Sequence, residues 1–337
     1  MAARRPSLDE VFAPRGVAVV GASATGRNFA TGVLMSLQAA GFPAIYPINP
    51  KHSEVLGLPC YASVSDVPGP VDHVVVSIPA EAALSLLDDC AAKGVRSVHF
   101  FTAGFSESGE AERADLELAM LDKARRGGFR ILGPNCIGLF VPRTKLVNSA
   151  SGPLEPGPVA FISQSGGHAT ILPAYGAPRG LRFSKVVSYG NGLDIDDAEL
   201  LDYLADDDET EVIAAYIEGA KDGGRFRRAL AKAAARKPVV IYKGGTTDAG
   251  QRAAYGHTAS LTSSVAVFNA LCRQTGAILV DDIDEMVDVL VALRFAQPLP
   301  RGKGVVIIGA GGGPSVLASD EMEKAGLHLP NLSPEER

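Results

Sequence analysis

The sequence predicts an α/β protein with two consecutive doubly wound parallel-sheet domains and the start of a third α/β unit. Short apolar runs alternate with stretches of helical period along most of the 337 residues, and this alternation is typical of βα units in a parallel sheet. Glycine-rich turns follow several of the apolar runs, where a strand would meet the next helix. At about 150 residues per domain, the length allows two domains or slightly more.

The first domain is predicted over residues 7–140. Ser7 and Glu10 have the spacing of a capping box, which predicts a short helix ahead of the sheet. Five apolar runs follow, separated by segments that are long enough for crossover helices. The predicted strands are 17–20, 44–48, 73–78, 97–101 and 130–132, and the predicted helices end at Leu37 or cover 80–93 and 109–126.

The second domain is predicted over residues 158–297. Residues 141–157 precede it; they hold several prolines and show no periodicity, which predicts a linker. The same alternation of apolar runs and helical stretches then predicts a second doubly wound sheet. The predicted strands are 159–162, 185–188, 212–217 and 238–242, and the predicted helices lie near 167–175, 198–204, 226–235 and 264–275.

A third α/β unit is predicted to begin within residues 303–337, after Pro298 and Pro300. An apolar run and a glycine-rich turn occupy residues 304–313, and a further helix would follow them. A single βα unit cannot bury a sheet of its own. We therefore expect the chain to be a fragment of a longer protein, or its tail to pack on another chain.

The composition argues against several classes of partner. The chain has 46% hydrophobic and 21% charged residues, and its formal net charge is −6, so no global field would attract nucleic acid or an anionic membrane. The N-terminus lacks an apolar leader segment, and no apolar stretch is long enough to span a bilayer. The four cysteines contain no CxxC pair, which predicts no metal site and a reduced, cytoplasmic location.

The turn after the first predicted strand, Gly21 to Arg27, opens a helix, where free backbone N–H groups can hold a phosphate. A Walker A loop would need lysine where Arg27 stands, and a nicotinamide site would need an acid after the second strand. Lys51 stands there instead. A lysine would pair with a phosphorylated ribose, although Lys51 taken alone is better interpreted as a solvated surface lysine.

Two further turns lie at carboxyl ends of predicted strands, where open parallel sheets bind ligands. In the first, Gly133 to Gly138, Cys136 has no histidine near it in the sequence and is interpreted as a structural cysteine. The second, Ser163-Gln-Ser-Gly-Gly167, again places backbone amides at a helix N-terminus. It is interpreted either as an anion site or as an ordinary βα turn.

Only one of the six histidines has surroundings that suggest chemistry. His257 lies in a segment of small residues between a predicted strand and the helix near 264, where a substrate could reach it. A histidine nucleophile needs its second ring nitrogen held by an acceptor, usually a carboxylate. Glu218 follows the strand 212–217 at the same carboxyl edge, and it is the acid that we nominate.

The interval between Lys185 and Lys221 contains no basic residue and many carboxylates. The ligand spacing of a calcium loop is absent from it, so a solvated acidic face is the favoured interpretation. The carboxylates are Asp194, Asp196, Asp197, Glu199, Asp202 and residues 206–209.

The order of these motifs resembles the α subunit, or α part, of the NDP-forming acyl-CoA synthetases, the superfamily of succinyl-CoA synthetase and ADP-forming acetate–CoA ligase. The resemblance covers nearly the whole chain. It is carried by VAVVGAS at 17–23, PINPK at 47–51, TAGFSE at 102–107, GPNCIG at 133–138, SQSG at 163–166, YIEG at 216–219 and GHT at 256–258.

The resemblance implies a Rossmann-like CoA-binding domain followed by a flavodoxin-like ligase domain. It implies that His257 is transiently phosphorylated and that Glu218 orients it. The CoA site that it implies consists of Gly21, Ser23, Lys51, Pro79 and Asn135, with Lys51 near the ribose phosphate. The implied cradle for the phosphoryl group consists of Ser165, Gly166 and Gly167.

The implied reaction converts acyl-CoA, phosphate and a nucleoside diphosphate, ADP in the first instance, into a carboxylic acid, CoA and ATP through acyl phosphate and a phosphohistidine. No ATP-grasp segment is present in the sequence, so Mg-ADP or Mg-ATP is expected on a partner β subunit or domain, in an oligomer. The segment after His257 reads Thr-Ala-Ser, which departs from the family's usual pattern. It motivates the alternative of a CoA-binding or acyl-CoA-binding regulatory module without ligase activity.

Overall fold

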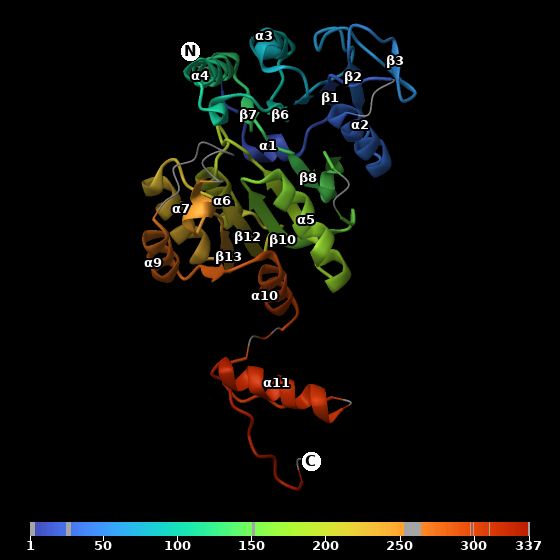
Figure 1. Ribbon diagram of the computed structural model, residues 1–337. Coiled ribbons are helices and arrows are strands. Elements are labelled where there is room, and N and C mark those ends of the chain that lie inside the picture. The colour runs from blue at the N-terminus through green and yellow to red at the C-terminus, as the bar shows by residue number, and fades with distance from the viewer. Residues whose placement is uncertain are drawn as a thin grey trace. The chain divides into compact units, whose positions relative to one another are not determined.

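The computed structural model describes residues 4–24, 28–149, 152–252, 264–296, 298, 300–309 and 311–335. The chain divides into two compact units, Met1–Val291 and Ala292–Arg337. The first unit contains both predicted parallel sheets (Figure 1). Within the ranges given above, no helix is both long and apolar enough to cross a bilayer.

The first sheet has five parallel strands in the order β2-β1-β5-β6-β7. All residues of β1, β5, β6 and β7 are buried, because helices cover both faces of the sheet. The buried residues include four polar ones, His73, Ser97, His99 and Arg130. The strands are β1 Val17–Val20, β2 Ile45–Ile48, β5 His73–Val76, β6 Ser97–Phe100 and β7 Arg130–Leu132.

The helices of the first domain confirm the predicted alternation. Ser7 and Glu10 form the capping box of α1, since each side chain bonds the backbone of the other residue. A small hairpin of β3 Glu54–Val55 and β4 Leu58–Pro59 was not predicted. The helices are α1 Leu8–Phe12, α2 Phe29–Ala40, α3 Ala83–Lys93 and α4 Ala111–Gly127, with short 3₁₀ turns before α3 and α4.

The second sheet has seven strands in the order β14-β13-β12-β10-β11-β8-β9. Its first five strands in this order are parallel, whereas β8 pairs antiparallel with β11 and β9 pairs antiparallel with β8. The strands are β8 Leu139–Val141, β9 Leu146–Val147, β10 Pro156–Ser163, β11 Phe183–Ser188, β12 Val212–Ile217, β13 Val239–Lys243 and β14 Ile278–Val280.

The segment 141–157, which the sequence analysis interpreted as a linker, differs from that expectation. It contains β9, and the strands β8 and β10 overlap its two ends. Its apolar residues Leu146 and Val147 are buried because β9 pairs with β8 along the edge of the second sheet. Strands of two or three residues between prolines give no periodicity that a sequence window could detect.

The helices of the second domain lie close to their predicted positions. They are α5 Gly166–Gly176, α6 Asp197–Asp206, α7 Gly223–Ala234 and α9 Val265–Thr275. The strand β14 and the helix α10 Ile283–Phe295 were not predicted. In Figure 1, α5 lies over β10, and the structure gives α6 and α7 extensive mutual contact.

Both sheets share one winding pattern. In each sheet the first parallel strand, β1 or β10, has the second strand on one side and the third strand on the other. The topological switch point, where the strand order reverses direction, therefore lies between β1 and β5 in the first sheet and between β10 and β12 in the second. Ligands of doubly wound sheets bind at the carboxyl ends of the strands at such points.

A buried cluster of hydrogen bonds links the first domain to the second. Arg130 of β7 is 2% exposed, and it donates hydrogen bonds to Asp194 Oδ2 at 2.9 Å and to Glu199 Oε2 at 2.6 Å. The backbone N–H of Ile131 donates to the same Asp194 oxygen at 2.9 Å. A buried guanidinium that donates to two separate carboxylates is geometrically specific, so these bonds set the orientation of β7 against α6 and the loop before it.

The second unit contains α11 Gly312–Lys324 and one isolated parallel bridge between Gly304 and His328. The apolar run at 304–309 was predicted to be the strand of this unit. Only Gly304 takes part in a β-bridge, and residues 305–309 form no strand, so this prediction is wrong. Val306 and Ile308 are exposed, at 50% and 94%. An apolar run becomes a buried strand only where neighbouring strands are available to pair with it.

Candidate active site

The two domains meet through the loop 133–138 of the first domain. The backbone N–H of Asn191, after β11, donates to Pro134 O at 3.0 Å, and Ile137 N donates to Ser188 Oγ at 3.3 Å. Gly190 approaches this loop so closely that a Cβ would lie 2.3 Å from Pro134 O. The carboxyl edge of the second sheet therefore lies directly against a loop at the carboxyl edge of the first.

Glu218 follows β12 at the switch point of the second sheet, and the residue is 5% exposed. The Tyr216 hydroxyl donates a hydrogen bond to Glu218 Oε1 at 3.2 Å. Gln164 Oε1, after β10, accepts hydrogen bonds from the backbone N–H groups of Glu218 and Gly219. These contacts hold the acidic residue and its backbone between the two central strands, so its position is preorganised.

The predicted phosphate cradle lies on the other side of the same switch point. Ser165 is the N-cap of α5 and accepts a hydrogen bond from His168 N at 3.4 Å. Gly166 packs against the first domain, since a Cβ there would lie 2.5 Å from Ile137 Cγ1. The helix has 11 residues, so the N–H groups of its first turn present the positive end of a helix dipole.

One cavity joins Glu218 to the cradle. Its volume is about 420 Å³, and both Ser165 and Glu218 line it. The other lining residues are Tyr216, Tyr242, Lys243, Gly244, Gly245, Thr246, Gly250 and Asp281. His257 lies outside the described residues. A carboxylate and a helix N-terminus that share one cavity can orient a cationic or neutral base and hold an anion beside it.

Three groups beside the cavity were not predicted from the sequence. Lys243 Nζ donates to Glu218 O at 2.7 Å, and burial lowers the pKa of this lysine. Burial and the nearby Glu218 carboxylate raise the pKa of Tyr216 well above its usual value. The His168 ring stacks on Tyr216 at 4.0 Å between ring centroids, and burial lowers the pKa of the histidine. Their signal in the sequence is their place at strand ends and in the first turn of α5.

The switch point of the first sheet has a different character. Gly21 has φ of 95°, and a Cβ there would lie 2.3 Å from Ser77 O, so only glycine fits this turn. Ser23 lies in the same turn and exchanges hydrogen bonds with Thr31 of α2 at 3.2 Å. Phosphate groups could approach the backbone closely here.

The remaining candidate CoA residues follow other strands of the first sheet. Lys51, after β2, is exposed, and its N–H donates to Asn49 Oδ1 at 3.0 Å. Pro79, after β5, is exposed as well. Asn135, after β7, has φ of 58° and donates its N–H to Thr102 O at 3.0 Å. All five candidate residues therefore lie beyond the carboxyl ends of strands in one sheet.

Cys136 is 3% exposed, and burial raises the pKa of its thiol. Its sulfur donates to Phe100 O at 3.8 Å. A thiol with a raised pKa is a poor nucleophile, so these contacts agree with the structural interpretation of this cysteine.

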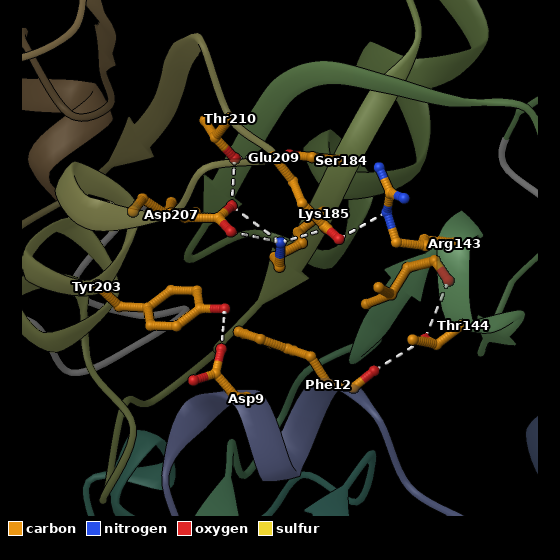
Figure 2. Close-up of polar contacts among 12 residues, drawn as sticks. Asp9, Phe12, Arg143, Thr144, Ser184, Lys185, Tyr203, Asp207, Glu209 and Thr210 are labelled. Atoms are coloured by element: carbon orange, nitrogen blue, oxygen red, sulfur yellow. Dashed lines mark hydrogen bonds and ion pairs between the residues drawn. The ribbon is translucent and has the colours of Figure 1, made fainter.

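Residues of the acidic interval bond to side chains of other elements and do not form a solvated face throughout (Figure 2). Lys185 is 4% exposed, and its Nζ lies 2.8 Å from oxygens of both Asp207 and Glu209. The Tyr203 hydroxyl donates to Asp9 of α1 at 2.7 Å. The expectation of a solvated face is wrong for Asp207, because β11 places a buried lysine beside it.

Comparison with known proteins agrees with this geometry. Residues 15–142 match a family described as a CoA binding domain, and residues 156–293 match the succinyl-CoA ligase like flavodoxin domain. The chain is 40% identical to the α subunit of ADP-forming acetate–CoA ligase II from Pyrococcus furiosus, over 96% of this chain and 70% of the relative. The chain belongs to the NDP-forming acyl-CoA synthetases, as an α part.

Other relatives place this α part within longer chains. ADP-forming acetate–CoA ligase II from Archaeoglobus fulgidus is 38% identical over 97% of this chain and 49% of its own length. The fold also matches a solved structure, acetyl-coenzyme A synthetase 1 from Ca. Korarchaeum cryptofilum in complex with phosphate and ADP. That match has a TM-score of 0.86 at 36% identity, covering 97% of the α part and 70% of that chain.

Proposed function

We propose that this α part catalyses the acyl-transfer and phosphohistidine steps of an ADP-forming acid–CoA ligase. The observation that carries the proposal is the single cavity lined by both Glu218 and the N-cap of α5. The first supplies a buried carboxylate for a histidine, and the second supplies backbone N–H groups for a phosphoryl group. The identity to acetate–CoA ligases supports the reaction class.

The proposed reaction balances in three steps. A phosphate oxygen bonds to the acyl carbon of acyl-CoA and the carbon–sulfur bond breaks, which releases CoA. His257 then attacks phosphorus, and the phosphorus–oxygen bond of the acyl phosphate breaks to release the carboxylate. Transfer of the phosphoryl group from His257 to ADP restores the histidine. All steps are reversible.

The described residues contribute positioning and electrostatics to these steps. Glu218 accepts a hydrogen bond from one ring nitrogen of His257 and leaves the other nitrogen free to attack. The turn Ser165–Gly167 holds the phosphoryl oxygens, and the charge of the helix terminus stabilises them. Tyr216 restrains the carboxylate through its hydrogen bond of 3.2 Å. Phosphoryl transfer depends chiefly on such positioning.

CoA would bind along the carboxyl edge of the first sheet. The backbone at Gly21 and Ser23 admits phosphate groups closely, since no side chain fits at Gly21. The exposed Lys51 pairs with the ribose phosphate. Pro79 and Asn135 line the route from this edge towards the second domain. The chain's own residues therefore fit the group that the family description names.

The remaining steps need a partner that binds Mg-ADP or Mg-ATP. An ATP-grasp β subunit or domain fills that role, and the working enzyme is an oligomer in the cytoplasm. Small carboxylic acids are the substrates. The relatives that are single chains extend to about twice the length of this α part, since it covers 49% of the Archaeoglobus ligase.

The decisive test is phosphorylation of the chain by its partner. The α part is incubated with Mg-ATP and the ATP-grasp component, and its intact mass is measured before and after acid treatment. We expect one acid-labile phosphoryl group on the parent protein and none on His257→Asn. A parent protein that binds CoA but acquires no phosphoryl group would instead be a CoA-responsive regulatory module.

A further inference from the structure

His168 touches both halves of the proposed reaction centre. It lies in the first turn of α5, and its backbone N–H donates to Oγ of Ser165, the N-cap residue of the phosphate cradle, at 3.4 Å. Its side chain stacks on the ring of Tyr216, with 4.0 Å between the ring centroids and 20° between the ring planes. The backbone of His168 therefore belongs to the cradle, while its side chain contacts the strand β12.

Tyr216 connects this contact to Glu218. The Tyr216 hydroxyl donates to Glu218 Oε1 at 3.2 Å, and burial together with the Glu218 charge raises the pKa of Tyr216, so the hydroxyl keeps its proton. Gly244 lies against the same group, because a Cβ there would be 2.4 Å from the Tyr216 oxygen and 3.2 Å from Glu218 Cγ. A shift of the Tyr216 ring would therefore displace a hydrogen-bond donor of the Glu218 carboxylate.

Two rings hold the Tyr216 side chain, which is 8% exposed as a residue. His168 covers one face of the Tyr216 ring, and Tyr242 of β13 contacts that ring at an angle of 63°, with 5.2 Å between centroids. The Tyr242 ring also meets His168 edge-on, at 80° and 5.7 Å. Stacked and edge-to-face pairs are the favoured arrangements of aromatic rings. Truncation of His168 would uncover one face of Tyr216 and leave its ring room to tilt.

The nitrogens of the His168 ring play no part in these contacts. Nδ1 is buried and has no hydrogen-bond partner among the described residues. Burial lowers the pKa of His168, although the Glu218 charge opposes this shift, so the imidazole is neutral at neutral pH. A neutral ring stacks on a phenol through its shape and its apolar surface. Phenylalanine would supply the same contact.

We propose that His168 is a positioning residue that fixes the Glu218 carboxylate relative to the phosphate cradle, through the ring of Tyr216. This inference rests on the proposed function, in which Glu218 orients His257 and the turn Ser165–Gly167 holds the phosphoryl group. His168 sets the spacing of these two elements, because its backbone is bonded to one and its ring restrains the hydrogen-bond donor of the other. Small misplacements of reacting groups slow a reaction strongly.

The test compares the rate at which the ATP-grasp component phosphorylates the parent chain, His168→Ala and His168→Phe with Mg-ATP. We expect about tenfold slower phosphorylation for His168→Ala. His168→Phe should stay within about twofold of the parent rate, because it restores the stacked ring. The CoA affinity of both variants, measured by calorimetry, should equal that of the parent, since the candidate CoA residues lie on the first sheet.

A double-mutant cycle tests whether Tyr216 carries the effect. Tyr216→Phe keeps the ring and removes the donor to Glu218, so phosphorylation should slow about tenfold. The double variant His168→Ala/Tyr216→Phe should be about as slow as either single variant, because both changes break one link. Tyr203→Ala is the matched control for lost packing. It removes another half-buried ring of the second domain, 5.5 Å from the ring of Phe12, and should leave the phosphorylation rate unchanged.

The outcomes separate this inference from the proposed function. Phosphorylation of His168→Ala at the parent rate would overturn the positioning role and leave the ligase proposal standing. Equal losses for His168→Phe and His168→Ala would also overturn it, because the imidazole nitrogens would then be required. Additive losses in the double variant would show that His168 does not act through Tyr216. An equal loss in Tyr203→Ala would attribute the effect to general packing. A parent chain that acquires no phosphoryl group would overturn both proposals.

Discussion

The two switch points of this molecule have the same winding and different chemistry. At the first, between β1 and β5, the candidate residues are a glycine with φ of 95° and exposed side chains such as Lys51. At the second, between β10 and β12, a carboxylate that is 5% exposed is held by a tyrosine hydroxyl and by backbone bonds to Gln164. The first switch point offers accessible backbone and exposed side chains. The second holds a buried carboxylate in a fixed position.

One topology can therefore serve both ligand binding and chemistry. A large anionic ligand needs close approach to backbone amides and adaptable surface charge, which cost the fold little. A group that must orient a nucleophile needs a fixed position, and a buried charge is stable only when it is hydrogen-bonded. Substitutions at the two switch points should therefore affect binding and chemistry separately.

Glu218→Gln should damage the second switch point alone. The amide keeps the size of the side chain but loses the charge that orients and stabilises a histidine during phosphoryl transfer. We expect ligase activity with the partner component to fall about 100-fold or more, while CoA affinity stays unchanged. Steady-state rates and calorimetry measure the two effects. Glu211→Gln, an exposed position before β12, is the control, and equal rates for the two variants would contradict the assigned role.

The pH dependence of stability should have opposite signs in the two domains. In the first, burial lowers the pKa of His73 to about 3 and of His99 to about 4. The unfolded chain therefore binds more protons below about pH 6.5, and each histidine lowers the free energy of unfolding by about 2 kcal/mol at pH 5. In the second, Asp197 has a pKa of about 7, so folded chains bind more protons and stability rises as pH falls from 7 towards 4.

Urea unfolding between pH 5 and pH 7 separates the contributions of the histidines and of Asp197 to the free energy of unfolding. His73→Asn keeps a polar group near Ser97, which lies 2.7 Å from His73 Nδ1, and it should reduce the loss of stability in acid. Asp197→Asn should remove the opposing gain and steepen that loss. Parallel pH profiles for the parent and both variants would show that neither group governs the acid response.

Two glycine substitutions should separate the switch points. Gly21→Ala places a methyl group 2.3 Å from Ser77 O in a left-handed turn, and Gly166→Ala places one 2.5 Å from Ile137 Cγ1. We expect the first to weaken CoA binding about tenfold with phosphorylation retained, and the second to slow phosphorylation about tenfold with CoA binding retained. Gly223→Ala, where a Cβ would meet nothing within 4 Å, is the control. Equal loss of both functions in each variant would contradict separate sites.

Lys51→Ala should have the smallest effect, since exposed ion pairs are weak and screened by salt. We expect CoA affinity to fall about threefold at low salt and the affinity for dephospho-CoA to stay constant. Competition binding at two salt concentrations measures both. Equal losses for the two ligands would place Lys51 away from the ribose phosphate.

The alternation of apolar runs and helical stretches determined most of the fold, because each βα unit is a local pattern. The capping box at Ser7 and Glu10 and the strands β1, β5 and β12 follow from residues close together in the chain. Doubly wound topology in turn places residues that follow strands at a shared edge. Glu218 and Ser165 were predicted in this way, and they line one cavity.

Strand pairing and burial that involve residues far apart in the chain became visible only in the tertiary structure. The strand β9 forms within the predicted linker because β8, which pairs with β11, offers it a free edge. Lys185 is buried because Asp207 and Glu209 surround it. Asn191 is buried because its side-chain amide donates hydrogen bonds to Glu107 and Glu117 of the first domain. Pairing and burial between residues far apart in the chain leave no periodicity in the sequence, and packing between the two domains creates them.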